Sequence, residues 1–238
     1  MIEKKKVLCL IPARGGSTGV PGKNLALING ESLTRRAVRC ANETSIFTDV
    51  LISTDDPKIK DEAVGEGAIA PFMRPKELAT NQSHVIDTVH HSLLEMEGLG
   101  KTYDYVVLLE PTSPLRTVEI VKSIVNAVIT ANVESGQTLS LVPDNYRPMK
   151  QMVLRSDGRT EDVLPMKEGI YRRQDLPLSY IRNGMVYVVS ADCIQNKNKI
   201  IGDVNIGRVV DGPAVNIDWP EDLEYARTII ESRENENT

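Results

Sequence analysis

The chain has 238 residues, of which 41% are hydrophobic and 26% are charged, so one large domain is expected and full disorder is excluded. Its formal net charge is only −5 and its three histidines are scattered, which excludes a nucleic-acid backbone as the main partner. A small anionic ligand held by a few local cations fits this charge balance better.

The start of the chain and the cysteines both indicate a protein of the reducing cytoplasm. The apolar run from Val7 to Pro12 is too short for a signal or membrane segment, so we predict a first buried strand and no membrane partner. Cys9, Cys40 and Cys193 lie far apart and lack metal-ligand spacing. We therefore interpret them as buried thiols without a catalytic role.

Apolar runs rich in β-branched residues alternate with amphipathic stretches along the chain. This alternation is typical of a mostly parallel sheet with helices on both faces, and it predicts an α/β fold of Rossmann-like type. The predicted strands are Lys6–Pro12, Asp49–Ser53, Ala68–Phe72, Tyr105–Leu109 and Met185–Val189.

Helices are predicted between and after these strands. The clearest one covers Val118–Ala131, where apolar residues recur at three- and four-residue spacing behind the capping residue Thr117. A second helix is expected from about Val85 to Met96, and a last one spans roughly Pro220 to Ser232.

The pattern changes between about Pro143 and Arg182, where prolines and glycines interrupt short, highly charged segments. This composition predicts an excursion from the sheet, such as a β-rich flap or a dimer-forming arm. We therefore expect a single domain over residues 1–238 with a small insertion at 143–182.

The loop from Ile11 to Asn24 carries the strongest chemical signal, because it holds four glycines, two prolines, Arg14 and Lys23 directly after the first strand. Glycines let backbone N–H groups approach phosphate oxygens, while the two cations neutralise charge. The P-loop and dinucleotide glycine spacings both fail, since Ser17 stands where the P-loop needs its first glycine. The alternative is a glycine-rich connector whose cations are merely solvated.

Two acidic segments allow a capping and a functional interpretation. Asp218, followed by Glu221 three residues later, fits a helix N-cap, yet its carboxylate also suits a magnesium ion that bridges phosphates. Asp56 is expected to cap the next helix, whereas Asp55, at the end of a strand, could face a ligand cleft.

Five segments carry a family resemblance, in this order: IPARGGSTGVPGKN, RPKELA, LLEPTSPLRT, RRQDLPLSYIRNGMVYV and VNIDWPEDLE. Their order and spacing over nearly the whole chain resemble the acylneuraminate cytidylyltransferases, which make CMP-sialic acid and bacterial relatives such as CMP-legionaminic acid. The resemblance implies a magnesium-dependent nucleotidyltransferase that moves CMP from CTP to the anomeric hydroxyl of an acidic nine-carbon sugar and releases pyrophosphate. It also implies a homodimer formed through residues 143–182.

Position by position, the resemblance implies a role for each site residue. Catalysis would depend on Arg14, Lys23 and Asp218, with magnesium held by Asp218 and Asn216. The residues implied to line the sugar are Glu110, Lys150, Arg173, Asn183 and Tyr187. The residues implied to contact the nucleotide are Ala13, Arg14, Gly15, Gly16, Ser17, Lys23, Asn24, Arg74 and Ser83, with Arg74 at the cytosine.

Five positions depart from the family pattern. Val85 replaces a typical hydroxyl residue and Asn81 a typical aspartate, and the other three bear directly on phosphate, metal and sugar. Thr18 replaces a usual lysine, so one phosphate cation is missing, and Arg172 or Arg182 is a candidate replacement. Asn216 replaces a usual aspartate, which favours fewer protein carboxylates on the metal. Glu110 stands where glutamine is common, and its carboxylate would accept hydrogen bonds from hydroxyls but repel a nearby sugar carboxylate.

Two other functions remain compatible with the sequence. The acceptor could be a phosphonate or an eight-carbon keto-acid, because the nucleotide half of the pattern is better marked than the sugar half. The departures at Thr18 and Asn216 also allow a CTP-binding protein without turnover.

Overall fold

A computed structural model describes residues 5–17, 19–165 and 176–236 of the chain and has a six-stranded sheet at its centre. The strand order is β10-β6-β9-β5-β1-β4, and only β9 runs antiparallel to its neighbours, so the predicted mostly parallel sheet is confirmed. The strands are β1 (Val7–Pro12), β4 (Asp49–Ser53), β5 (Tyr105–Leu108), β6 (Ser135–Leu141), β9 (Tyr180–Ser190) and β10 (Asn205–Val209).

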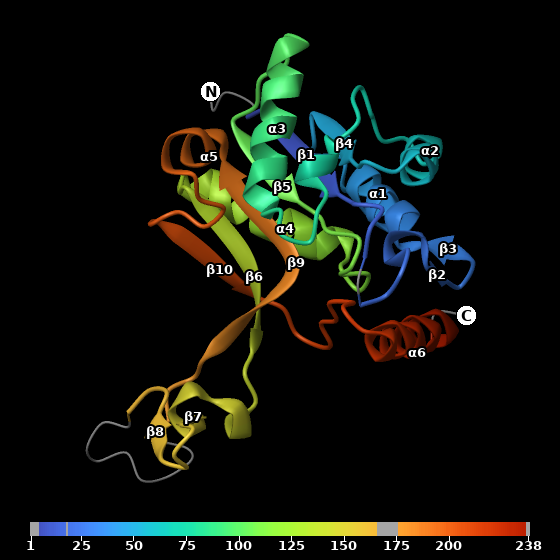
Figure 1. The fold of residues 1–238 in the computed structure, drawn as a ribbon. Helices are drawn as coiled ribbons and strands as arrows, with labels where there is room; N and C mark the ends of the chain where they lie inside the picture. Colours follow the sequence, from blue (N-terminus) through green and yellow to red (C-terminus); the bar gives the residue numbers. More distant parts are fainter. Residues whose placement is uncertain (1–4, 18, 166–175, 237–238) are drawn as a thin grey trace.

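Helices cover both faces of this sheet, as the alternating pattern predicts (Figure 1). One face carries α3 (Val85–Gly98) and α5 (Ala191–Lys197). The larger core on the other face includes side chains of α1 (Leu33–Thr44), α2 (Pro57–Gly65), α4 (Val118–Ala131) and α6 (Pro220–Glu236). A short hairpin of β2 (Leu27–Ile28) and β3 (Glu31–Ser32) precedes α1.

Strand β1 shows why both faces are covered, because its side chains alternate between two apolar cores. Val7, Cys9 and Ile11 belong to the core with α1 and α4, while Leu8 and Leu10 belong to the core with α3 and α5. All five residues are at most 2% exposed. A strand buried on both faces must be apolar throughout, which explains the continuous apolar run near the start of the chain.

Helix α4 begins and ends where its local signals lie. The Thr117 hydroxyl accepts the N–H of Ile120 at 3.4 Å and caps the first turn. Asn132 has a left-handed φ of 50° and ends the helix. The helix therefore covers the predicted range Val118–Ala131.

Residues 68–72 do not form the strand that their composition predicts. Ile69 makes only an isolated parallel bridge to Leu51 of β4, in which the Ile52 N–H donates to the Ile69 carbonyl at 3.1 Å. Pro71 has no N–H with which to continue the ladder, so regular pairing stops there.

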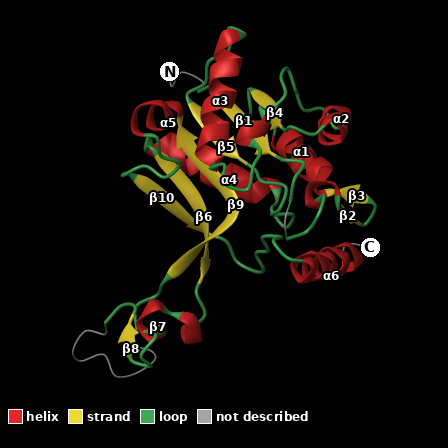
Figure 2. Ribbon diagram, viewed as in Figure 1, coloured by secondary structure: helices red, strands yellow, loops and turns green. Residues whose placement is uncertain are grey.

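Strands β6 and β9 extend beyond the body of the sheet and carry a small projection, seen at the bottom of Figures 1 and 2. β9 begins at Tyr180 and is therefore longer than the predicted strand at 185–189. We call the described residues 143–165 and 176–182 the arm. It contains the 3-10 turns η3 (Asp144–Tyr146) and η4 (Pro148–Lys150) and the hairpin of β7 (Met152–Leu154) and β8 (Thr160–Asp162).

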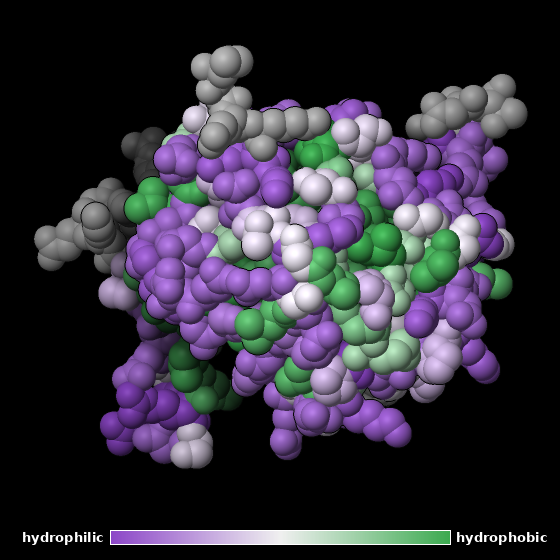
Figure 3. All heavy atoms as spheres, turned by 90° about the horizontal axis from the view of Figure 1, so that it is seen from above, coloured by the Kyte–Doolittle hydropathy of each residue, from purple (hydrophilic) through white to green (hydrophobic). Residues whose placement is uncertain are grey.

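Within the described ranges, no helix is both long and apolar enough to cross a membrane. On the face shown in Figure 3, hydrophobic side chains are interspersed with hydrophilic ones. Such a mixture is ordinary for the surface of a folded domain.

Candidate active site

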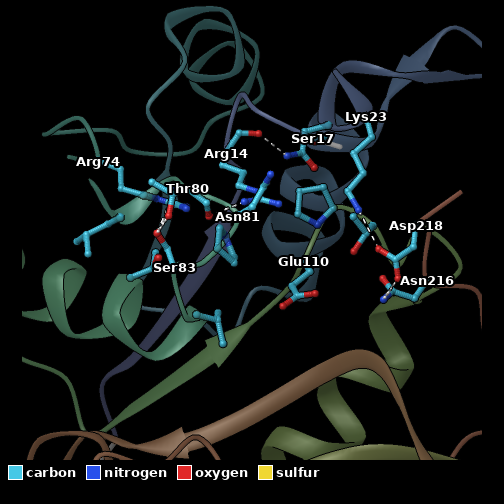
Figure 4. Close-up of a pocket in the computed structure, with 17 residues that line it drawn as sticks. Arg14, Ser17, Lys23, Arg74, Thr80, Asn81, Ser83, Glu110, Asn216 and Asp218 are labelled. Carbon is cyan, nitrogen blue, oxygen red and sulfur yellow. Dashed lines mark hydrogen bonds and ion pairs between the residues drawn. The ribbon is translucent and has the colours of Figure 1, made fainter. Parts of the chain in front are cut away.

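The ends of β1, β4 and β5 meet at one edge of the sheet, and the segments that follow them line a cavity of about 230 Å³ (Figure 4). In α/β sheets, the carboxyl ends of parallel strands form the usual ligand crevice. The sequence-predicted site residues that line the cavity are Arg14, Ser17, Lys23, Asn24, Arg74, Ser83, Glu110, Asn216 and Asp218.

The glycine-rich loop after β1 is held by the segment that follows β4. The Asp55 carboxylate accepts the N–H of Gly15 at 2.9 Å, and the carbonyl of Ser53 accepts the N–H of Ala13 at 3.0 Å. Two backbone donors predicted to contact the nucleotide, Ala13 and Gly15, are therefore already bonded within the protein. Asp55 orients the loop, while its neighbour Asp56 caps α2 as its sequence position predicts.

Arg14 directs its guanidinium toward the cavity, where it donates to the carbonyl of Thr80 at 2.5 Å. Its own carbonyl accepts from Asn24 Nδ2 at 2.9 Å. Ser17 Oγ and Asn24 Oδ1 are buried without a hydrogen-bond partner among the described residues. Buried polar atoms are normally paired, so these two atoms fit a ligand that supplies the missing partners. A Cβ added at Gly16 would meet nothing within 4 Å, which leaves room beside the loop.

Lys23 connects the glycine-rich loop to the C-terminal part of the chain. Its Nζ donates to the carbonyl of Ile217 at 2.7 Å and pairs with Asp218 Oδ1 at 3.0 Å. Gly19 makes the close approach of these segments possible, because a Cβ on it would lie 2.0 Å from the carbonyl oxygen of Asp218. The loop and the segment before α6 therefore form one wall of the cavity.

Asp218 does not cap α6, so one of the two interpretations of its sequence is wrong. The helix begins at Pro220, and the Asp222 carboxylate accepts the N–H groups of Asp218 at 2.9 Å and Trp219 at 2.8 Å. The capping acid is thus Asp222 and not Glu221, which the sequence pattern favoured. Because Asp222 accepts the N–H groups just before the helix, the Asp218 carboxylate is not needed there and instead pairs with Lys23 beside the cavity.

Asp218 and Asn216 offer a small set of oxygen donors for a cation. Asn216 Nδ2 donates to Asp218 Oδ2 at 3.2 Å, which leaves the amide oxygen of Asn216 as a second donor. The described residues contain no cluster of three or more His, Cys, Asp or Glu side chains that could hold a metal. One carboxylate and one amide oxygen fit a magnesium ion that takes its other ligands from phosphates and water.

Arg74 lies on the side of the cavity formed by the segment after β4 (Figure 4). Its guanidinium donates to Ser53, from Nε to Oγ at 3.1 Å and from a terminal nitrogen to the carbonyl. Burial lowers the pKa of Arg74 to about 10, and the charge of Asp55 opposes this effect. The guanidinium therefore stays charged at neutral pH. Nearby, the Ser83 hydroxyl donates to the carbonyl of Glu77 at 2.9 Å, beside η2 (Lys76–Leu78).

The turn after β5 joins the cavity to β9. The guanidinium of Arg116, which is only 7% exposed, donates to the carbonyls of Glu110 and Met185, the latter at 3.0 Å. The Ser113 hydroxyl donates to the carbonyl of Gly184 at 3.0 Å. These bonds fix the main chain of the turn, and with it the position from which Glu110 projects.

Glu110 presents its carboxylate to the cavity between the sides that carry Arg14 and Lys23 (Figure 4). Burial raises the pKa of this carboxyl above its ordinary value. The positive charges of Arg116 and Lys23 reduce the effect, whereas the negative charge of Asp218 adds to it. Glu110 is therefore a carboxylate that protonates at a higher pH than a solvated glutamate does.

Two residues predicted to contact the sugar are not part of the cavity lining within one chain. Lys150 ends η4, which belongs to the arm. Asn183 bonds Thr138 at 2.6 Å and Ser140 at 3.1 Å, so its amide is used to join β6 and β9. Neither residue lines the cavity.

Tyr187 is half-buried on β9, where burial and then the charge of Glu110 raise its pKa. Arg182, one candidate replacement for the missing phosphate cation, is exposed on the same strand and does not line the cavity. The predicted sugar contact Arg173, the other candidate cation Arg172 and the substituted position Thr18 lie outside the described residues.

Sequence reasoning gave no role to several residues that shape the cavity. Thr80 supplies a carbonyl to Arg14, and Thr112 lines the cavity beside Glu110. Gly19 lets two segments approach closely because it has no side chain. Arg116 is buried and donates hydrogen bonds to main-chain carbonyls, which fixes the turn beside the cavity. A residue that acts through its backbone carbonyl, such as Thr80, cannot be recognised from its side chain. Gly19 and Arg116 could have been singled out, because both lie in motifs that carry the family resemblance.

A mostly parallel sheet whose first loop brings glycines and two cations to a polar cavity is typical of nucleotide-binding proteins of the α/β class. A family model described as Cytidylyltransferase matches residues 8–236. The chain belongs to the cytidylyltransferase family, and the resemblance seen in its sequence is confirmed.

The chain is also similar to individual members of this family. It is 30% identical over 224 residues to a CMP-N,N'-diacetyllegionaminic acid synthase from Legionella pneumophila, with 94% of each chain covered. It is 28% identical over 225 residues to a pseudaminic acid cytidylyltransferase from Campylobacter jejuni, covering 94% of this chain and 96% of the relative.

Solved structures support the fold independently. A CMP:2-keto-3-deoxy-manno-octonic acid synthetase complexed with CTP superposes with a TM-score of 0.72 at 16% identity, covering 96% of this chain and 99% of that one. A 4-diphosphocytidyl-2C-methyl-D-erythritol synthase from Anaerococcus prevotii gives a TM-score of 0.63 at 10% identity, covering 97% and 98%. At such low identity these structures show a shared fold alone.

Proposed function

We propose that this cytidylyltransferase moves the CMP portion of CTP to the anomeric hydroxyl of a nonulosonic acid and releases pyrophosphate. Relatives named for legionaminic and pseudaminic acid support the acceptor class, and family membership supports the cytidylyl transfer. The proposal depends above all on the cavity in which Arg14, Lys23 and Asp218 lie together at the carboxyl edge of the sheet.

The glycine-rich loop is proposed to hold the triphosphate. Phosphoryl transfer needs positioning and charge stabilisation more than a covalent protein intermediate, so two fixed cations and a magnesium ion would supply what the reaction needs. Arg14 and Lys23 neutralise the charge that grows on the α-phosphate and on the leaving pyrophosphate. Ser17 and Asn24 contribute the buried polar atoms that lack a protein partner, and Gly16 leaves room for a phosphate oxygen.

The two ends of the cavity are proposed to bind the cytosine of CTP and the acceptor sugar. Arg74, with donors beyond the two that Ser53 uses, and Ser83 lie on the side assigned to cytosine. Glu110 lines the side assigned to the sugar, and Tyr187 lies near it on β9. An acidic sugar would therefore meet a polar wall near the α-phosphate.

Magnesium is proposed to bind beside Asp218 and Asn216, whose oxygen donors fit a hard cation. When bound, the ion would supply positive charge to the phosphate oxygens. We expect a chelator to abolish pyrophosphate release and an excess of magnesium to restore it. If pyrophosphate release continues after dialysis against a chelator and in its presence, the proposed role of magnesium is wrong.

A homodimer formed through the arm is also proposed. Large apolar side chains are exposed along it, and an apolar patch of this kind usually marks an interaction site. Such an interface would place Lys150 away from the cavity of its own chain and toward the cavity of the partner. The exposed side chains are Tyr146, Met152, Val153, Leu154, Val163, Leu164, Leu178, Tyr180 and Ile181.

The function is tested by pyrophosphate release from CTP and magnesium with a panel of acceptors. The panel contains legionaminic, pseudaminic and sialic acids, an eight-carbon keto-acid and a phosphonate. We expect release with at least one nonulosonic acid and with CTP in preference to UTP. Release with the eight-carbon acid or the phosphonate alone would change the acceptor class. If calorimetry shows that CTP binds but no acceptor leads to pyrophosphate release, the chain would be a CTP-binding protein without turnover.

The site of action is proposed to be the cytoplasm. All three cysteines are free thiols, as expected for a protein of a reducing compartment. Fractionation of the native host with an antibody against the chain would test this location.

A further inference from the structure

We propose that Asp55 is a positioning residue that couples the phosphate side of the cavity to the cytosine side, through Gly15 on one side and Arg74 on the other. The inference rests on the proposed function, which assigns the glycine-rich loop to the triphosphate and Arg74 to cytosine. Asp55 is not one of the residues that line the cavity, so it acts through its neighbours and not on a substrate.

The link to the phosphate side is a hydrogen bond between two segments that lie far apart in the chain. Oδ1 of Asp55 accepts the N–H of Gly15 at 2.9 Å, across 40 positions of sequence. Gly15 directly follows Arg14, whose guanidinium faces the cavity. A hydrogen bond to an ionised acceptor is roughly twice as strong as a neutral one. Asp55 therefore fixes the main chain from which Arg14 reaches into the cavity.

The glycine-rich loop also packs directly against the segment that contains Asp55. A Cβ added at Gly15 would lie 2.9 Å from the side chain of Asp56, so this position has no room for one. Beside it, the N–H of Ala13 donates to the carbonyl of Ser53 at 3.0 Å. Two hydrogen bonds and one close backbone approach thus fix the start of the loop to the end of β4.

The link to the cytosine side lies in the backbone next to Asp55. The N–H of Arg74 donates to the carbonyl of Thr54 at 2.8 Å, and its guanidinium donates to the hydroxyl and the carbonyl of Ser53. The Ser53 carbonyl therefore accepts from Arg74 and from Ala13 of the loop at the same time. Ser53 and Thr54 are at most 1% exposed, so water does not compete for these bonds. The two sides of the cavity are joined by one continuous network of buried contacts.

The charge of Asp55 adds an electrostatic link to this network. Burial lowers the pKa of Arg74 to about 10, the charge of Asp55 opposes this effect, and the charge of Arg14 adds to it. Asp55 thus offsets the repulsion between the two arginines that are proposed to bind different parts of CTP. A guanidinium only donates hydrogen bonds, so it suits the acceptor N3 of cytosine and not the N3–H of uracil. An Arg74 that is held in place therefore favours CTP over UTP.

The test compares Asp55→Ala with Asp55→Asn, whose amide oxygen can still accept the N–H of Gly15 but carries no charge. Calorimetry measures the affinity of each full-length variant for pyrophosphate, CTP and UTP. We expect Asp55→Ala to bind pyrophosphate about tenfold more weakly, as the loss of a hydrogen bond to a charged group implies. Asp55→Asn should keep the pyrophosphate affinity of the wild type. Both variants should reduce the preference for CTP over UTP by about fivefold or more, the usual range of coupling between sites.

The control is Asp61→Ala at an exposed position of α2, which should change none of the three affinities. Urea unfolding establishes that each variant is folded at the temperature of the binding measurements. If Asp55→Ala does not fold, the preference of Asp55→Asn for CTP over UTP decides the question.

The possible failures can be distinguished. If the wild type binds CTP and folded Asp55 variants keep all its affinities, the coupling is overturned and the proposed function stands. If Asp55→Asn binds pyrophosphate as weakly as Asp55→Ala, the hydrogen bond to Gly15 does not position the loop, and the inference is also wrong. A wild-type chain that neither binds CTP nor releases pyrophosphate with any acceptor would overturn the proposed function, and the inference with it.

Discussion

Lys23 Nζ lies 3.0 Å from Asp218 Oδ1, although 195 positions separate the two residues in the chain. The contact unites the first and the last motif of this cytidylyltransferase in one wall of its cavity. The Asp218 side chain is 58% exposed, and ion pairs that reach solvent contribute little to folding. The pair therefore matters mainly because it positions the Lys23 ammonium at the cavity that we propose binds the phosphates.

Replacing Lys23 by alanine is expected to lower kcat/KM for CTP by about 10²–10³-fold, because preorganised charge at the phosphates is lost. The thermal midpoint should change little, since the pair is partly solvated. Lys122→Ala on α4 is the matched control, and pyrophosphate release gives the rates. Unchanged kcat/KM in the Lys23 variant would exclude Lys23 from the mechanism.

The close approach at Gly19 predicts a second functional loss. A Cβ there would lie 2.0 Å from the carbonyl oxygen of Asp218, so alanine must push the loop away from the segment before α6. We expect Gly19→Ala to lower the free energy of unfolding by about 1–3 kcal/mol and to weaken CTP binding. Gly65→Ala, where a Cβ meets nothing within 4 Å, is the control. Equal urea midpoints and equal CTP affinities in the two variants would contradict the prediction.

Arg116 is expected to contribute far more to stability than a surface arginine does. Arg116→Met would leave the carbonyls of Glu110 and Met185 without their buried donor, at a cost of about 1–3 kcal/mol for each carbonyl. Arg39→Met, which breaks an ion pair with Glu31 on a half-exposed side chain, should cost at most about 1 kcal/mol. Urea unfolding of both variants measures the difference, and similar losses would show that the buried bonds are not decisive.

Cys9 is expected to be unreactive in the folded enzyme. It is fully buried on β1, and burial raises the pKa of its thiol far above neutral. Iodoacetamide at neutral pH should leave Cys9 unmodified by peptide mapping and should leave the transferase activity intact. Loss of activity in step with alkylation of Cys9 would contradict both the buried position and the absence of a catalytic thiol.

The arm predicts a change of oligomeric state on mutation. Leu154 is 71% exposed at the end of β7, and Leu94 is 64% exposed on α3 away from the arm. If the arm forms a homodimer, Leu154→Glu should shift the sedimentation profile toward the monomer, whereas Leu94→Glu should not. A wild-type chain that sediments as a monomer at all concentrations would reject the dimer.

Elements with strong local signals were predictable from sequence. α4 and β4 match their predicted bounds because periodicity, caps and apolar runs are encoded within each segment. β6 was missed because Ser135–Leu141 is rich in small and polar residues. Its packing explains that composition, since a Cβ at Gly136 would meet the Val128 side chain of α4 at 2.3 Å. Such a tertiary requirement leaves no periodic pattern.

The residues of the candidate site could be predicted where the side chains of a sequence motif themselves line the cavity. Arg14, Lys23 and Asp218 are of this kind, although their meeting depends on contacts between distant segments. The capping acid was assigned wrongly, because Glu221 and Asp222 are adjacent and only the geometry of the helix start distinguishes them. The distance of Lys150 from the cavity follows from the projection of the arm, which sequence spacing does not reveal.

The uninterrupted run of β9 from the arm into the middle of the sheet has a consequence for protein engineering. The pairing of β6 with β9 shifts register between Gln137 and Leu139. After the shift, Leu139 pairs with Arg182 and Ser140 pairs with Ile181. The register of these two strands therefore fixes how the arm is oriented. A chimera that exchanges arms between relatives must cut both strands at paired positions, because a slip of one residue would turn Asn183 to the opposite face. The arm and its two stem strands are therefore a single cassette, to be transplanted whole.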